Sequence, residues 1–202
     1  MRIAAGLIAL LALAPPLRAQ DPLLAARTKG SSTAPIVVYE MSDFQCPWCR
    51  RHALETWPTL LKEYVETGKV RWTFINFPLT QIHPNAAAAA EFAMCAAQEG
   101  AFWRIHDLLY LYQEKWGPLK DPAPFLITFA DSAGIQRARL TTCLTSGVMR
   151  PVGQADAVGA ARAGAASTPS FYVEGGILAG FQPTSVLKQI LDSIYAEKTG
   201  KK

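Results

Sequence analysis

The stretch IVVYEMSDFQCPWC, residues 36–49, decides the fold. Its first six residues are mostly apolar and β-branched, which predicts a buried strand. After a short polar turn come Cys46 and Cys49, and apolar residues then recur at steps of three and four, the spacing of an amphipathic helix. The stretch therefore predicts a strand, a turn and a helix, with Cys46 at the start of the helix.

The chain around this stretch contains a polar leader and a second strand. Residues 21–35, rich in alanine, serine and threonine, are expected to form a loose leader. Residues 70–77 are largely apolar and predict a strand, which completes a β-α-β unit. Pro58 lies inside the helical pattern, and we expect a kink there because its ring clashes with the carbonyl of Leu54.

A long helical block begins the second half of the chain. Between residues 84 and 164 no strand pattern occurs, and amphipathic segments separated by glycine and proline predict four or five short helices. Strand patterns return at residues 170–173 and 177–179 around a Glu-Gly-Gly turn, which predicts a hairpin. A last amphipathic helix is expected to begin near Pro183.

This order of elements predicts an α/β fold. A β-α-β unit in residues 35–80 and a β-β-α unit in residues 165–197 form one domain, and residues 84–164 form an all-helical insertion between them.

The first 20 residues have the pattern of a secretory signal peptide. Arg2 supplies a positive start, residues 3–13 form an apolar run too short to span a bilayer, and residues 17–19 form a plausible cleavage site. An amphipathic first helix is the weaker reading, because this segment has no polar face. We expect a periplasmic or other extracytoplasmic protein that is soluble after cleavage.

The charge balance gives no indication of a nucleic-acid partner. Without Arg2 and Arg18, 18 of the 20 basic residues remain against 16 acidic ones, so the net charge of the mature chain is about +2 rather than +4. A nucleic-acid-binding domain normally carries a strong basic excess.

The spacing of Cys46 and Cys49 suits thiol–disulfide exchange. Unpaired backbone N–H groups and the helix dipole favour an anion at the first cysteine, and such thiols have a pKa of roughly 3.5 to 7.5 instead of about 8.5. We expect Cys46 to attack and be attacked, and Cys49 to resolve the mixed disulfide. The chemistry needs no cofactor beyond the redox-active disulfide, and stabilising the thiolate favours the oxidation of other proteins.

Three other interpretations compete for this cysteine pair. A zinc half-site lacks a second Cys-x-x-Cys or a His pair to complete four ligands. Haem attachment needs His after the second cysteine, where Arg50 stands. An inert structural disulfide fits poorly between a buried strand and a helix. We therefore expect no metal here.

Four ordered segments resemble the DsbA-like family of thiol–disulfide oxidoreductases in the thioredoxin superfamily. They are residues 43–49, residues 77–79 with 83–86, residues 102–107 and residues 167–171. The resemblance covers residues 35–195 and implies a thioredoxin-like fold, a central mixed sheet flanked by helices, with an all-helical insertion.

The resemblance also assigns roles to residues far from the cysteines. Pro169 matches a cis proline beside the disulfide, and the backbone of Thr168 would pair with an extended substrate segment. Glu40 matches a buried acid that accepts a proton from Cys49. The alternatives are that Pro169 only punctuates a loop and that Glu40 faces solvent at the strand end.

One position departs from the family pattern. The best known oxidases of the family carry His next to the second cysteine, whereas Trp48 stands there, and an indole offers no cation to the thiolate. Trp48, together with Pro47 in the first helical turn, is expected to contact client chains.

The other two cysteines lie in the helical block. In an oxidising compartment Cys95 and Cys143 are expected to form a structural disulfide, a pattern some branches of the DsbA-like family share. The alternative is two free buried thiols. His52 and His106 are interpreted as surface and packing residues, and His83 as a turn residue.

The leading hypothesis is an exported dithiol oxidase that passes its disulfide to unfolded or partly folded exported proteins and is reoxidised by a membrane partner. A disulfide reductase or isomerase on the same fold is the second hypothesis. A metal- or peptide-binding module is the third, although no Met or His cluster lies near Cys46.

Overall fold

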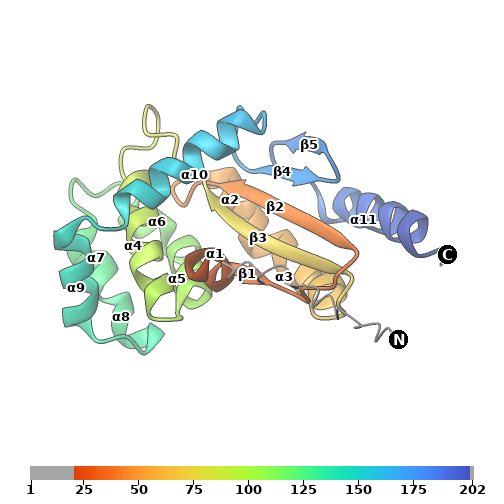
Figure 1. Ribbon diagram of the computed structural model, residues 1–202. Coiled ribbons are helices and arrows are strands. Elements are labelled where there is room, and N and C mark those ends of the chain that lie inside the picture. The colour runs from red at the N-terminus through yellow and green to blue at the C-terminus, as the bar shows by residue number, and fades with distance from the viewer. Residues whose placement is uncertain (1–20, 201–202) are drawn as a thin grey trace, which may run out of the picture.

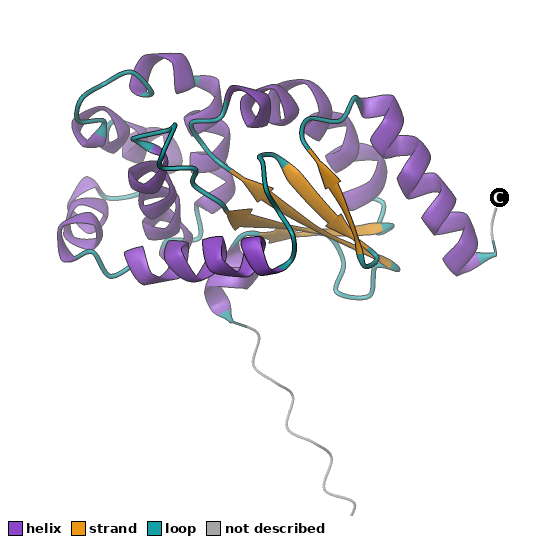
Figure 2. Cartoon of the chain, turned by 90° about the horizontal axis from the view of Figure 1, so that it is seen from above, coloured by secondary structure: helices purple, strands orange, loops and turns teal. Residues whose placement is uncertain are grey.

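The computed structural model describes residues 21–200, and the predicted signal peptide, residues 1–20, lies outside the described residues. A central sheet carries helices on both faces (Figure 1). In the view of Figure 2 the helical block lies at one end of the sheet and the C-terminal helix at the other. Among residues 21–200, no helix combines the length and the apolar composition needed to cross a bilayer.

Five strands form one mixed sheet in the order β1-β3-β2-β4-β5. The strands are β1 (Thr28–Lys29), β2 (Ile36–Ser42), β3 (Val70–Asn76), β4 (Ser170–Val173) and β5 (Gly176–Ala179). β2 and β3 run parallel, and all other neighbours run antiparallel. The predicted fold class, an α/β fold with a central mixed sheet flanked by helices, is confirmed.

The leader is not loose, which corrects the expectation for residues 21–35. It contains a short helix, α1 (Pro22–Ala26), and β1, which pairs with β3. Arg27 between them is buried and forms a bidentate ion pair with Asp156. A two-residue strand carries too little hydrophobic pattern to be recognised, and the contacts that hold it come from residues distant in sequence.

Alternate residues of β2 pack on opposite faces of the sheet. Ile36 and Val38 join a core with the helix that follows the cysteines and with α11 (Thr184–Thr199). Met41 instead packs with Ala160 of α10 (Arg150–Arg162) on the other face. The two-residue period of a strand therefore points Glu40 and Ser42 toward the side that carries the cysteine helix.

The helix after the cysteines runs through two wide π-turns. Its segments are α2 (Pro47–Arg51), η1 (His52–Thr56), α3 (Trp57–Leu60) and η2 (Leu61–Val65). The N–H of Trp57 donates to the carbonyl of His52, five residues back, just before Pro58. The predicted irregularity is thus met by a π-turn, which accommodates the missing N–H of proline and shifts the phase of the helix.

Seven helices, rather than four or five, occupy the block. They are α4 (Ala86–Gln98), α5 (Phe102–Leu111), α6 (Gln113–Trp116), α7 (Ala123–Ile127), α8 (Phe129–Ala133), α9 (Arg137–Ser146) and α10. The two additional breaks fall at Tyr112 and Thr128, where no glycine or proline marks them. Helices α4 to α9 gather beyond the sheet, and α10 returns across it toward β4 (Figure 1).

The hairpin and the last helix are confirmed. β4 and β5 pair around Glu174 and Gly175, which both have positive φ, of 48° and 85°. That conformation matches the right-handed twist of a two-residue hairpin. Helix α11 begins at Thr184, directly after Pro183, and buries Leu187 and Leu191 against the sheet.

Candidate active site

The end of β2 and the start of α2 position the first cysteine. Cys46 is the N-cap of α2, with extended backbone angles of −71° and 125°, and Pro47 occupies the first turn, where its missing N–H leaves no helical bond unmade. The sulfur of Cys46 therefore lies at the positive end of the helix, beside unpaired N–H groups.

A buried carboxylate shapes the turn that leads into Cys46. Asp43 accepts hydrogen bonds from the backbone N–H of Gln45 at 2.7 Å and from that of Leu79 at 2.9 Å. Its second oxygen also lies 2.8 Å from Nδ1 of His83. Asp43 thus ties the cysteine turn to the loop after β3, a role that the sequence analysis did not assign, although the residue lies in a segment it singled out.

A glutamine of the helical block holds the same turn from the other side. Nε2 of Gln113 in α6 donates to the carbonyls of Phe44 at 2.7 Å and Cys46 at 3.0 Å. Gln45 reaches back to the carbonyl of Gly117 at 2.9 Å. The block therefore contributes directly to the geometry of the cysteine turn, and nothing in the local sequence marked Gln113.

Cys46 and Cys49 are both free thiols, and their surroundings separate their acidities. The pKa of Cys46 is lowered from 9.0 to about 6. The largest cause is a hydrogen bond from Cys49. Burial opposes this shift, and a hydrogen bond with Thr168 lowers the pKa further. The pKa of Cys49 is raised well above 9.0, mainly by burial. The hydrogen bond with Cys46 and the negative charge of Cys46 raise it further. Near neutral pH the pair is a thiolate at Cys46 and a thiol at Cys49.

The loop before β4 places a proline beside the first cysteine. The peptide bond between Thr168 and Pro169 is cis. The sulfur of Cys46 lies 3.4 Å from the carbonyl oxygen of Thr168, although 122 residues separate them in the chain. The two residues that the family resemblance selected are thus brought together with the cysteines.

An aromatic surface borders the cysteines. Trp48 is 53% exposed, and its ring lies 6.2 Å from that of Phe181, between β5 and α11. The guanidinium group of Arg51 lies over both rings, 5.9 Å from the first and 4.6 Å from the second. Neither Phe181 nor Arg51 was singled out from the sequence, because only the fold brings Phe181 to the motif.

Glu40 is buried, not exposed at the strand end. Only 2% of the residue is accessible, and Oε2 accepts a hydrogen bond from Nε1 of Trp72 at 2.9 Å. The same oxygen lies 3.7 Å from Nε2 of His52. These contacts put Glu40 in the core on the side of the sheet that carries α2.

The interpretation of His52 as a surface residue is wrong. It is buried, and within the described part of the chain neither ring nitrogen has a hydrogen-bond partner. Burial lowers the pKa of His52, against the opposing charge of Glu40. His52 lies three residues after buried Cys49 and four residues before buried Thr56, so it belongs to the inward face of the helix. His106 is a packing residue, as expected, and lies among the rings of Phe44, Phe74 and Trp103.

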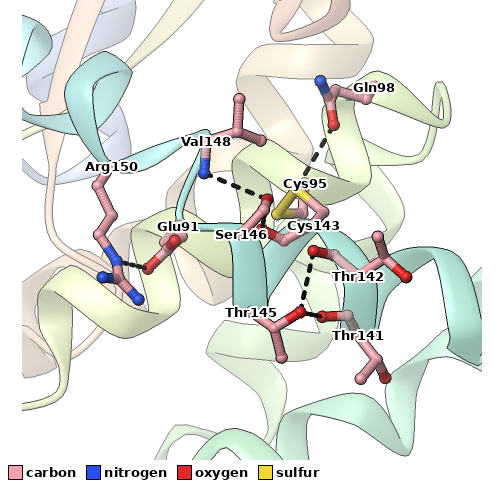
Figure 3. The surroundings of a disulfide bond; sticks show 10 residues. All are labelled: Glu91, Cys95, Gln98, Thr141, Thr142, Cys143, Thr145, Ser146, Val148 and Arg150. Atoms are coloured by element: carbon pink, nitrogen blue, oxygen red, sulfur yellow. Dashed lines mark hydrogen bonds and ion pairs between the residues drawn. A yellow bond between two sulfur atoms is a disulfide. The ribbon is translucent and has the colours of Figure 1, made fainter.

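Cys95 and Cys143 form a disulfide between α4 and α9 (Figure 3). The bond closes a sequence separation of 48 residues with a Cα–Cα distance of 5.8 Å. It lies within the helical block and is separate from the cysteine turn. Among residues 21–200, no group of three or more His, Cys, Asp or Glu side chains is arranged to hold a metal ion.

Comparison with known proteins relates the whole domain to one family. A family model described as thioredoxin matches residues 24–193. The Na(+)/H(+) antiporter NhaA 3 of Salinispora tropica is 34% identical over 149 residues, which is 73% of this chain but 21% of that protein. The probable disulfide bond formation protein D of Bacillus anthracis is 38% identical over 86 residues, 43% of this chain and 40% of that one. The chain thus spans less than half the length of these curated relatives.

A solved structure has the same fold over nearly its full length. The crystal structure of Wolbachia pipientis alpha-DsbA1 superposes with a TM-score of 0.76 at 18% identity and covers 87% of this chain and 93% of that one. The match includes the sheet and the helical block. The family resemblance seen in the sequence is confirmed: the chain belongs to the thioredoxin family and is similar to DsbA-like proteins within it.

Proposed function

We propose that the protein is an exported dithiol oxidase that transfers a Cys46–Cys49 disulfide to other proteins. The observation that carries this proposal is the unequal acidity of the pair, with the pKa of Cys46 lowered to about 6 and that of Cys49 raised. An ionised first sulfur and a protonated second sulfur suit disulfide exchange.

The transfer proceeds in two exchanges. A client thiolate attacks the sulfur of Cys46, the bond to Cys49 breaks, and its electron pair goes to Cys49, which takes up a proton. A second client thiolate then attacks the client sulfur of the mixed disulfide and releases Cys46 as a thiolate. The client loses two electrons and gains a disulfide, and the protein gains a dithiol.

The low pKa of Cys46 favours this direction. At pH 7 a thiol of pKa about 6 is stabilised by about 1.4 kcal/mol relative to one of pKa 9.0. That free energy stabilises the reduced protein and makes the couple more oxidising by about 30 mV. Cys46 is also the better leaving group in the second exchange, because the lower pKa belongs to the sulfur that must depart.

The surroundings of the cysteines suit an extended, unfolded client. We propose that the backbone of Thr168, beside the cis Pro169 and 3.4 Å from the sulfur of Cys46, pairs with a client segment by strand addition. Trp48 and Pro47 offer exposed apolar area next to the reacting sulfur. Glu40 is proposed to take part in moving the proton of Cys49.

The first 20 residues and the exchange reaction suggest a compartment and a partner for the protein. The apolar first 20 residues support export to the periplasm or another extracytoplasmic space, where client disulfides persist. A protein that gives away its disulfide needs an oxidant to restore it, and we propose a membrane protein in that role. The reaction uses the disulfide itself and needs no bound cofactor.

A reductase or isomerase is the second candidate, and Trp48 is the observation that favours it. The position next to Cys49 carries a neutral indole, where the best known oxidases of the family have a histidine. An indole places no positive charge beside the thiolate, so it does not add to the oxidising power of the couple.

Equilibration with glutathione redox buffers tests the proposal. The fraction of reduced protein is measured by acid quenching and thiol alkylation, with Cys46→Ser as the control that forms no intramolecular disulfide. An oxidase is expected to have a reduction potential nearer to about −120 to −180 mV than to about −270 mV. A value near about −270 mV would support the reductase instead.

A further inference from the structure

The buried sulfur of Cys49 has to carry negative charge during exchange, although its surroundings oppose this. It leaves as a thiolate when a client attacks Cys46, and it attacks as a thiolate in the reverse step. Cys49 is fully buried, and burial destabilises an unpaired charge. The groups that face this sulfur therefore decide how fast the Cys46–Cys49 bond opens and closes.

Two hydrogen-bond donors face the sulfur of Cys49. The backbone N–H of Asp43 lies 3.5 Å from it. The second is the side chain of Ser42, the last residue of β2 and the neighbour of Asp43, which lowers the pKa of Cys49 through hydrogen bonding. Ser42 is 1% exposed, so no water competes for its hydroxyl.

A third buried group orients the hydroxyl of Ser42. The phenol oxygen of Tyr110, in α5, lies 3.0 Å from Oγ of Ser42 and 3.4 Å from the carbonyl oxygen of Asp43. Tyr110 is fully buried, so its phenol hydrogen-bonds to these protein groups rather than to solvent. The sequence analysis gave no role to Ser42 or Tyr110, and the link joins residues 68 positions apart.

We propose that Ser42 and the amide of Asp43 form a two-donor site for the thiolate of Cys49, and that Tyr110 is a positioning residue that orients the Ser42 hydroxyl. The inference rests on the proposed thiol–disulfide exchange and assigns one part of its machinery. Donors held close to the place where charge develops in a dry site lower the barrier, because little of the surroundings has to move.

The hydroxyl pair can serve both protonation states of the sulfur. When Cys49 is a thiol, it donates to the thiolate of Cys46, while Ser42 donates to Tyr110 and Tyr110 donates to the carbonyl of Asp43. When Cys49 is a thiolate, Tyr110 donates to Ser42 and Ser42 donates to the sulfur. Rotation of the two hydroxyl groups thus turns the hydrogen of Ser42 toward Cys49 when this sulfur becomes a thiolate, and no atom of the backbone has to move.

The two-donor site acts on the step in which the Cys46–Cys49 bond breaks. A thiolate attacks the sulfur of Cys46, a new disulfide forms, the bond between Cys46 and Cys49 breaks, and the electron pair remains on Cys49 as a thiolate. The reverse step passes through the same transition state, so the two donors accelerate opening and closing alike.

The test compares Ser42→Ala with wild type in reaction with glutathione. The reduced protein is mixed with glutathione disulfide, quenched with acid and analysed by mass spectrometry for the mixed disulfide at Cys46. Cys49 is expected to close the mixed disulfide about tenfold more slowly in Ser42→Ala than in wild type. This factor lies at the lower end of the effect of losing a hydrogen bond to a charged group, because sulfur is a weak acceptor. The mixed disulfide should therefore accumulate.

Further measurements separate this role from a merely structural one. The pH profile of closing is expected to move to higher pH in Ser42→Ala, whereas the rate at which iodoacetamide alkylates Cys46 stays unchanged. Tyr110→Phe keeps the ring and is expected to slow closing by a smaller factor. Thr73→Val is the matched control, because it removes another buried strand hydroxyl, bonded to Thr28, and is expected to react like wild type.

The outcomes distinguish the inference from the proposed function. If Ser42→Ala folds and closes its mixed disulfide at the wild-type rate, the two-donor site is refuted while the exchange activity stands. Equal slowing in Thr73→Val would also refute it, since the loss would then follow from any buried hydroxyl. If glutathione disulfide neither forms a mixed disulfide at wild-type Cys46 nor oxidises the Cys46–Cys49 pair, the proposed function itself fails.

Discussion

The stability of the reduced protein is predicted to depend on pH through Cys46. In the folded protein its pKa is about 6, against 9.0 for an ordinary cysteine, so the folded state binds fewer protons than the unfolded chain between these values. Stability then rises with pH. The contribution is fully present above pH 9.0 and is lost as the pH falls through about 6.

The magnitude follows from these two values. The contribution of Cys46 to the free energy of unfolding is about 2.7 kcal/mol at pH 8, about 1.4 kcal/mol at pH 7 and about 0.1 kcal/mol at pH 5. The thiol of Cys49 contributes little in this range, because its raised pKa keeps it protonated in the folded state and an ordinary cysteine is also mostly protonated there. The expected loss between pH 8 and pH 5 is therefore about 2.6 kcal/mol.

The assay is urea unfolding of the reduced protein at several pH values, with Cys46→Ser as the comparison. His52 also destabilises the folded state in acid, because burial lowers its pKa and the unfolded chain takes up a proton below pH 6.5. That effect is common to both proteins and cancels in the difference. A difference between wild type and Cys46→Ser that stays constant from pH 5 to pH 8 would refute the reasoning.

Three further predictions address other parts of the structure. Replacing both Cys95 and Cys143 by alanine is expected to lower the free energy of unfolding by up to about 4 kcal/mol in urea titrations while disulfide exchange with glutathione persists, and an equal loss of exchange would contradict the separation of the two cysteine pairs. Trp48→Ala is expected to raise the KM for an unfolded cysteine-containing peptide severalfold and to leave the rate with glutathione unchanged; equal effects on both substrates would show that Trp48 acts on the cysteines rather than on clients. His52→Phe is expected to reduce the loss of stability at pH 5 by up to about 2 kcal/mol, as measured by unfolding at pH 5 and pH 7, and an unchanged acid loss would mean that His52 is not neutral in the folded state.

Features encoded in contiguous residues could be predicted from the sequence. The strand ending at Ser42, the turn and the helix start at Cys46 all lie within a few residues, and hydrophobic periodicity and helix-end chemistry act on that scale. The hairpin around Glu174 has an equally local signal. The position of Pro169 beside Cys46 required the family resemblance, because 122 residues separate Cys46 from Thr168.

Features that depend on tertiary contacts could not be predicted. β1 is recognised only by its pairing with β3, and Gln113 reaches the cysteine turn from a helix 67 residues away. His52 was misplaced because its inward position shows only once the helix is packed, with Cys49 and Thr56 buried on the same face. The break at Tyr112 separates two helices without any glycine or proline to indicate it.

A titration of Cys46 in the reduced native protein tests the central claim most directly. The rate of alkylation and the ultraviolet absorbance of the thiolate are followed against pH, and Cys46→Ser supplies the background. The structure predicts a midpoint at about pH 6, three units below an ordinary cysteine at 9.0. A midpoint near 9.0 would remove the ionised sulfur on which the proposed exchange depends.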